Sequence, residues 1–213
     1  MLGLAIFTTG LIAIAILVTY PKLPPLDSLQ HYQPKMPLTI YSADGQIIGV
    51  YGEQRREFTK INDFPDILKN AVIAAEDKRF YEHWGVDVWG IARAAISNIV
   101  AGGVQSGAST ITQQVAKNFY LSSERTFTRK FNEALLAYKI EQSLSKDKIL
   151  ELYFNQIYLG QRAYGFASAA QIYFNKNVKD LTLAEAAMLA GLPKAPSAYN
   201  PIVNPERAKL RQT

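Results

Sequence analysis

With 213 residues, the chain is long enough for one domain with a hydrophobic core and a small additional segment. Hydrophobic residues make up 48% of it and charged residues 19%, which excludes an intrinsically disordered protein. The absence of cysteine excludes disulfides, a thiolate nucleophile and cysteine-ligated zinc. The formal net charge of +5 favours an anionic partner, and on charge alone nucleic acid, anionic lipid and a phosphorylated metabolite all stay open.

The N-terminal segment is predicted to be a membrane anchor, because residues 2–20 contain no charged side chain. A helix of about 19 residues rises roughly 28 Å, close to the thickness of a bilayer's hydrocarbon core. A cleaved signal peptide is the alternative, but no basic segment precedes the apolar run and no small-x-small cleavage site follows it. The stiff, proline-rich residues 21–25 follow instead, so we expect an uncleaved transmembrane helix over residues 1–20.

Residues 21–59 have the composition of a linker with one short β-hairpin at residues 38–51, where Asp44-Gly45 provides the turn. No chemistry is evident in this linker. From residue 60 onward the apolar periodicity is helical and no further strand is predicted. The fold class is therefore expected to be mainly α, with one domain over residues 60–213.

Residues typical of helix N-caps predict where several helices of this domain begin. Asp63 and Asp87 are predicted to cap two helices, and Ser145 a later one. Thr182 and Glu185 form a predicted capping box before an alanine-rich helix. In the helix that begins near residue 129, four residues are expected to pack inward: Phe131, Leu135, Tyr138 and Leu144.

The most unusual stretch is residues 74–85, which concentrates adjacent carboxylates, basic residues, aromatic rings and one of the two histidines. Glu76 and Asp77 end an apolar helix there. Carboxylates beside aromatic rings have the ingredients of an acid or base with a tuned pKa. A helix end with solvated charges and buried rings explains the composition equally well.

Two further stretches have candidate binding chemistry. Glycine followed by serine and threonine at residues 107–110 offers backbone N–H groups and hydroxyls to an anion, and Thr110, Gln114 and Lys117 share a helix face. A capped, solvated polar helix is the simpler explanation of that stretch. Arg129 and Glu133 stand four residues apart, which suits either a structural ion pair or a cationic clamp for an anionic group.

Five segments, taken in order, resemble the motifs of the peptidoglycan glycosyltransferase family, and more narrowly the N-terminal part of class A penicillin-binding proteins. They are residues 76–85 (E-D-x-x-F-x-x-H-x-G), 107–114 (G-x-S-T-I-T-Q-Q), 129–133 (R-K-x-x-E), 146–155 and 192–197. One such match is weak, but five in order between residues 60 and 200 are specific. The departure we note is Phe154, where the family often has leucine.

The resemblance implies a lysozyme-like helical head with a small membrane-associated jaw, here roughly residues 97–128. It also implies polymerisation of lipid II into β-1,4 glycan strands, with inversion at the donor's anomeric carbon. Glu76 matches the family's general base, and Glu133 its second essential carboxylate near the pyrophosphate. The residues expected to bind substrate are Asp77, Ser109, Thr110, Gln114, Lys117, Asn118, Arg129, Lys130 and Lys194.

No cofactor is certain from this resemblance, but a divalent cation (Mg or Mn) near the pyrophosphate would offset the charge of Glu133. The expected partners are lipid II, the growing glycan strand, the lipid bilayer and other cell-wall synthesis proteins, and not nucleic acid. The expected location is the bacterial inner membrane, with the catalytic domain on the periplasmic or outer side. The resemblance also implies sensitivity to moenomycin, which mimics the lipid-linked donor.

Two other functions are weighed against this one. A lysozyme-like enzyme that cleaves murein would use the same glutamate, but it has less use for an anchor and for the cationic residues of the second and third motifs. A non-catalytic membrane-anchored scaffold would not need both glutamates and the basic residues intact. A transpeptidase domain is expected to follow residue 213 in the native protein.

Overall fold

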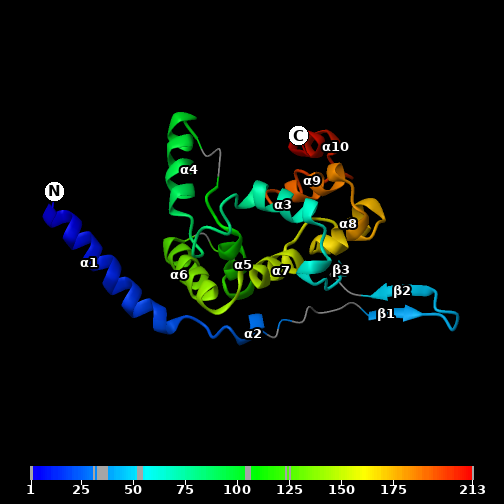
Figure 1. Ribbon diagram of the computed structural model, residues 1–213, viewed down its shortest axis with the longest axis horizontal. Coiled ribbons are helices and arrows are strands. Elements are labelled where there is room, and N and C mark those ends of the chain that lie inside the picture. Colours follow the sequence, from blue (N-terminus) through cyan, green and yellow to red (C-terminus); the bar gives the residue numbers. More distant parts are fainter. Residues whose placement is uncertain are drawn as a thin grey trace. The chain divides into compact units, whose positions relative to one another are not determined.

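The computed structural model describes residues 2–30, 32, 38–51, 55–103, 107–122, 124 and 126–212. Its secondary structure is mainly helical, as predicted (Figure 1). The chain forms two compact units. Unit 1 contains Met1–His31 and His83–Leu144, and unit 2 contains Tyr32–Glu82 and Ser145–Thr213.

The helices of each unit are as follows. Unit 1 has α1 (Leu2–Thr19), a 3-10 turn (Tyr20–Lys22), α2 (Asp27–Gln30), α4 (Val88–Val100), α5 (Ile111–Tyr120) and α6 (Phe127–Ser143). Unit 2 has α3 (Asp66–Glu76), α7 (Lys146–Gln156), α8 (Phe166–Phe174), α9 (Leu183–Gly191), α10 (Pro205–Gln212) and the 3-10 turns Ile61–Asp63 and Val178–Asp180.

The strands are short and belong to unit 2. They are β1 (Leu38–Tyr41), β2 (Ile47–Tyr51), β3 (Arg55–Arg56) and β4 (Ala163–Tyr164). Strands β1 and β2 form the predicted antiparallel hairpin, with Gly45 at φ 81° in its turn. Strands β3 and β4 pair in parallel, which corrects the expectation that no strand follows the hairpin. The pairing joins residues more than a hundred positions apart in the sequence, so no local pattern could predict it.

The N-terminal segment is helical, but the predicted transmembrane span is not supported. In the part of the chain that the structure describes, no helix is both long enough and apolar enough to cross a membrane. Helix α1 ends at Thr19 after 18 residues, and Pro21 lies in the 3-10 turn that follows.

Part of the predicted linker belongs to unit 1 instead. Leu26 and Leu29 are buried, at 7% and 0% exposure. Lys139 Nζ on α6 donates to the carbonyl oxygens of Leu23, at 3.3 Å, and of Pro24, at 2.9 Å. These contacts fix the residues after α1 against α6.

In unit 1, α5 packs against α6. The buried stripe of α6 consists of Glu133, Leu136, Ala137 and Ile140. Of the four residues predicted to pack inward, Tyr138 is 47% exposed, so the prediction is wrong there, whereas Phe131, Leu135 and Leu144 are half-buried. Helical spacing alone does not decide which face of α6 is covered, because that depends on neighbours such as α5.

In unit 2, α7 lies in the core, since residues 149–155 are all buried. The Phe154 ring packs between Phe64, 5.0 Å between centroids, and Phe166, at 4.7 Å. The Glu151 carboxylate accepts the Ile61 N–H at 3.1 Å. These contacts give Phe154 and Glu151 structural roles in the core of unit 2.

Two of the four predicted helix caps are confirmed: the side chains of Ser145 and Thr182 cap α7 and α9, and Thr182 forms its capping box with Glu185. Thr110, which was not predicted, caps α5 in the same way. Asp87 is the N-cap residue of α4, but its side chain makes no capping hydrogen bond. Asp63 does not cap α3. That helix begins at Asp66, because a residue before proline disfavours the helical conformation and Phe64 precedes Pro65 in extended backbone.

Candidate active site

The buried carboxylate of the third motif is Glu133, and two cations of its own helix hold it. Glu133 is 2% exposed. Arg129 Nη1 lies 2.5 Å from Glu133 Oε2, and Lys130 Nζ pairs with Oε1. Lys130 also donates to Ser109 Oγ at 2.8 Å. Both carboxylate oxygens are therefore engaged within unit 1, and the predicted pair of Arg129 and Glu133 is present.

This cluster has an excess of positive charge, because two cations face one carboxylate. The Lys130 side chain is 45% exposed, so part of that charge faces solvent. In the part of the chain that the structure describes, buried Arg129 Nε and Asn132 Oδ1 have no hydrogen-bond partner. An exposed ammonium beside a guanidinium is suited to phosphate oxygens, which accept charge-assisted hydrogen bonds.

The second motif is tied to the first through Thr110. Its hydroxyl donates to the Gly85 carbonyl oxygen at 2.6 Å and accepts the Gln113 N–H at 3.1 Å. Gln113 Oε1 accepts the Thr110 N–H at 3.0 Å, which completes a capping box. The single O–H proton of Thr110 is thus used inside unit 1, and this side chain positions the start of α5.

The other polar residues of the second motif lie nearer the surface. The side chains of Ser109, Lys117 and Asn118 are exposed, and that of Gln114 is half-buried. Exposed amide and ammonium groups at the same helix are available donors. Lys194, after α9 in unit 2, is exposed as well.

The backbone conformation of Gly85 and its close approach to α6 explain why the first motif ends in glycine. Its φ is 89°, and a Cβ atom there would lie 2.7 Å from the backbone carbon of Ala137 on α6. The Gly85 N–H donates to His83 Nδ1 at 3.2 Å, and His83 is buried. His83 therefore shapes this loop.

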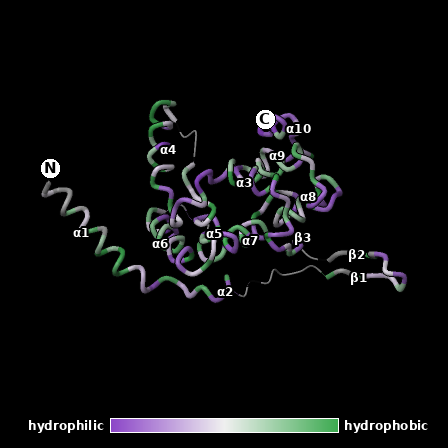
Figure 2. The backbone as a smooth tube through the Cα atoms, in the orientation of Figure 1, coloured by the Kyte–Doolittle hydropathy of each residue, from purple (hydrophilic) through white to green (hydrophobic). Residues whose placement is uncertain are grey.

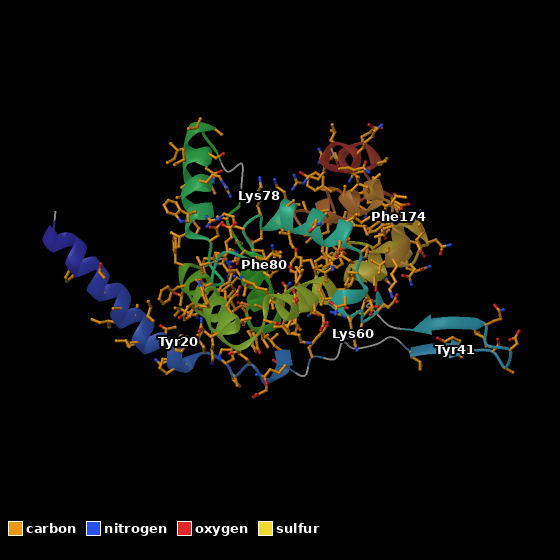
Figure 3. All side chains as sticks on the ribbon, viewed as in Figure 1. Tyr20, Tyr41, Lys60, Lys78, Phe80 and Phe174 are labelled. Carbon is orange, nitrogen blue, oxygen red and sulfur yellow. The ribbon has the colours of Figure 1, made fainter. Side chains whose placement is uncertain are left out.

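In unit 2, the first-motif carboxylates stand at the end of α3. Glu76 is the last residue of the helix and is half-buried, and Asp77 is its C-cap and is 6% exposed. The Phe80 N–H donates to the Asp77 carbonyl oxygen at 2.9 Å, and Lys146 Nζ of α7 lies 4.5 Å from the centre of the buried Phe80 ring. Figure 3 labels Phe80 in the loop that follows α3.

Tyr153 on α7 is a polar residue of this region that sequence reasoning missed. It is 1% exposed, and its hydroxyl has no hydrogen-bond partner in the described part of the chain. Burial raises the pKa of Tyr153 well above its usual value, and the nearby charges of Glu76 and Asp77 raise it further. The available signal was a phenol at the centre of a helix whose neighbours are mostly apolar.

No group of three or more His, Asp or Glu side chains that could hold a metal ion occurs within the described residues. At Glu133, the one buried carboxylate beside the cations, both oxygens are already paired. The donor set around Glu133 therefore does not fit a metal ion held by protein ligands.

Residues 44–213 match the transglycosylase family, and the chain belongs to that family. Among its relatives, penicillin-binding protein 1A of Neisseria cinerea is 89% identical over 211 residues, which are 99% of this chain and 26% of that protein. Penicillin-binding protein 1A of Pseudomonas aeruginosa is 52% identical over 198 residues, 93% of this chain and 24% of that protein. The chain thus spans about a quarter of the length of these relatives.

A crystal structure of penicillin-binding protein 1A from Haemophilus influenzae is 31% identical and covers 84% of this chain and 17% of that chain, with a TM-score of 0.44. The family resemblance inferred from the five sequence motifs is confirmed by the family match.

Proposed function

We propose that this chain is the peptidoglycan glycosyltransferase part of a longer cell-wall enzyme. Its substrates are lipid II and the growing glycan strand. In each step the 4-hydroxyl oxygen of the acceptor sugar bonds to the anomeric carbon of the donor. The bond from that carbon to the pyrophosphate oxygen breaks, with inversion, and polyprenyl pyrophosphate leaves. Membership of the transglycosylase family and the names of the relatives support this reaction.

The observation that carries the proposal is the cationic cluster around Glu133. The departing pyrophosphate carries negative charge away from the sugar, and fixed cations stabilise such charge best. Arg129 and Lys130 are held by Glu133 before substrate arrives, and Ser109 fixes Lys130 further. In this proposal Glu133 is essential because it arranges the cations, and its own charge is already offset by them.

Glu76 is the proposed general base. The acceptor hydroxyl must lose a proton as its oxygen attacks, and a half-buried carboxylate at a helix C-terminus is suited to take it. Asp77, with its buried side chain, supports the position of this base.

The exposed polar residues are the proposed contacts to phosphate and sugar. They are Ser109, Gln114, Lys117, Asn118 and Lys194. Thr110 contributes through the position of α5, because its hydroxyl is already used. No step of the proposed reaction uses a divalent cation, because the side chains around Glu133 do not fit a metal ion held by the protein. Inhibition by moenomycin is part of the same proposal.

A membrane surface is the proposed place of action, on the outer side of the bacterial inner membrane, because lipid II carries a polyprenyl tail. Helix α4 exposes most of its large apolar side chains, including Trp89 at 73%, Ile99 at 79% and Val100 at 83%. Figure 2 colours the C-terminal turns of α4 mostly hydrophobic. We assign this surface, together with α5, to the lipid-facing jaw of a lysozyme-like head. Other cell-wall synthesis proteins are further proposed partners.

The test is polymerisation of labelled lipid II in detergent by the wild-type chain and by Glu76→Gln. The amide keeps the shape of the side chain but cannot accept the proton. Product from the wild type and none from a folded Glu76→Gln variant supports the reaction and the base. No product from folded wild-type protein contradicts the enzyme and favours a non-catalytic scaffold. Shortening of preformed glycan strands instead would favour a murein-cleaving enzyme.

A further inference from the structure

The hydroxyl of Tyr153 is a buried donor that the proposed mechanism does not use. The side chain is 1% exposed and the hydroxyl has no partner in the described part of the chain. A buried polar group without a hydrogen bond destabilises the folded state, whereas phenylalanine would fill the same space at no such cost. The hydroxyl is therefore a feature that packing alone does not explain.

The hydroxyl cannot turn to water, because its ring is fixed inside unit 2. The rings of Tyr153 and Phe154 meet edge to face, 6.3 Å between centroids, and Phe154 packs in turn on Phe64 and Phe166. The residues before and after Tyr153 on α7 are buried as well. Whatever the hydroxyl donates to must already lie beside it or arrive with substrate.

The face of α7 that carries Tyr153 is the face that meets the first motif. Lys146 stands seven residues earlier, two helical turns away, and so lies on the same face as Tyr153. Its ammonium lies over the Phe80 ring, and Phe80 is hydrogen-bonded to the Asp77 carbonyl oxygen. The carboxylates of Glu76 and Asp77 are also the charges that act on the Tyr153 hydroxyl.

We propose that Tyr153 is a positioning residue for Glu76: its hydroxyl donates a hydrogen bond to the Glu76 carboxylate when substrate is bound. This rests on the proposed role of Glu76 as the general base. The bond holds the carboxylate toward the acceptor hydroxyl and favours its ionised form, the form that accepts a proton. Between the two carboxylates we choose Glu76, because it is the proposed base and is half-buried, whereas Asp77 is the buried C-cap of α3.

The experiment compares lipid II polymerisation by the wild-type chain and by Tyr153→Phe, with kcat, KM and the pH profile of kcat. We expect kcat to fall about 10-fold to 100-fold, as for a misplaced proton acceptor, with KM within about twofold of the wild type. The acidic limb of the profile should move to higher pH, because a base that has lost a donor needs a higher pH to stay ionised. The thermal midpoint should stay the same or rise, since an unpaired hydroxyl is removed.

Tyr173→Phe is the matched control. This tyrosine of unit 2 donates its hydroxyl to the Leu159 carbonyl oxygen at 2.8 Å, so its loss should lower the thermal midpoint and leave kcat and the pH profile unchanged. An equal loss of kcat in both variants would overturn the proposal. So would a Tyr153→Phe variant with wild-type kcat, or one in which only KM rises, since the hydroxyl would then be structural or a substrate contact.

A second substitution keeps the inference testable if Tyr153→Phe does not fold. Fluorotyrosine at position 153 is nearly isosteric and has a more acidic hydroxyl, which is a stronger donor. The acidic limb should then move to lower pH, opposite to the change in Tyr153→Phe, and an unchanged limb would contradict the inference. The two failures can be told apart. A wild-type chain that makes no polymer contradicts the proposed function itself, whereas the outcomes above contradict only the role of Tyr153.

Discussion

Arg129 and Glu133 stand one helical turn apart on α6, and the guanidinium Nη1 lies 2.5 Å from the carboxylate Oε2. The Glu133 side chain is only 3% exposed, whereas the Lys130 ammonium on its other oxygen belongs to a side chain 45% exposed. The pair therefore differs from a surface salt bridge, because the carboxylate has no access to water that could replace its partners. Glu133 fixes both cations, and one of them still faces solvent.

Glu133→Gln should lower the free energy of unfolding by about 1–3 kcal/mol, because two cations lose their buried partner. It should also abolish most lipid II polymerisation, since Arg129 and Lys130 are no longer held for the pyrophosphate. Urea unfolding and the polymerisation assay measure the two effects. Asp66→Asn is the control: its exposed i,i+3 pair with Lys69 should contribute less than about 1 kcal/mol. Wild-type activity in Glu133→Gln would contradict the assigned role of the cluster.

Gly85→Ala should destabilise the chain by more than about 2 kcal/mol, because a positive φ alone costs about 1–2 kcal/mol and the new Cβ would meet backbone atoms of α6. Gly45→Ala is the matched control, since Gly45 has φ 81° but nothing within 4 Å of a new Cβ. Only the strain of the backbone is then added, and the loss should be about 1–2 kcal/mol. Equal losses in chemical denaturation would show that the close approach of Gly85 to Ala137 is unimportant.

The sequence could predict features that depend on near neighbours. The capping roles of Ser145 and Thr182 were predicted because a cap needs a hydroxyl and a free N–H two or three residues later. The same reasoning failed at Asp63, where the rule that a residue before proline stays extended outweighs the capping propensity.

The features that were not predicted depend on contacts distant in the sequence. Which face of α6 is buried depends on α5, and the pairing of β3 with β4 brings together segments with several helices between them. The Tyr153 hydroxyl, which has no partner among the described residues, is of the same kind, since its surroundings depend on what packs around α7 in space. The five motifs predicted the residue types of the candidate site. They did not predict that Thr110 caps α5 and donates a hydrogen bond to the Gly85 carbonyl oxygen.

Thr110→Val should reduce both stability and polymerisation, because it removes the bond to Gly85 and the cap of α5 while keeping the side-chain volume. The expected loss of stability is about 1–2 kcal/mol. Thr182→Val removes the corresponding cap of α9 and should cost a similar free energy without changing kcat. The two variants are compared at matched folded fraction. An equal effect on kcat would mean that Thr110 acts through stability alone.

Replacing both Ile99 and Val100 by Asn should weaken binding to vesicles that contain anionic phospholipid, because these side chains are 79% and 83% exposed at the end of α4. Sedimentation with vesicles measures the effect. The control replaces Ile202 and Val203 by Asn, which are 60% and 61% exposed in unit 2, and should leave binding unchanged. Equal binding by both double variants and the wild type would remove α4 from the proposed lipid-facing surface.

Glu185 predicts a loss of stability in acid. The Lys176 ammonium, 2.8 Å from the carboxylate, and then the Thr182 N–H lower the pKa of Glu185 from 4.5 to about 2. A carboxyl whose pKa is lowered by folding stabilises the folded state above its unfolded pKa, and that contribution is lost as pH falls toward about 2.

Glu185→Gln should therefore have a lower melting temperature than the wild type at pH 7, and the difference in melting temperature should shrink steadily as the pH falls from about 5 to about 2. Thermal melts at several pH values measure this, with Glu206→Gln, at an exposed position, as the control. If the difference in melting temperature between Glu185→Gln and the wild type stays constant down to about pH 2, the interactions of Glu185 with Lys176 and Thr182 do not depend on the ionised carboxylate.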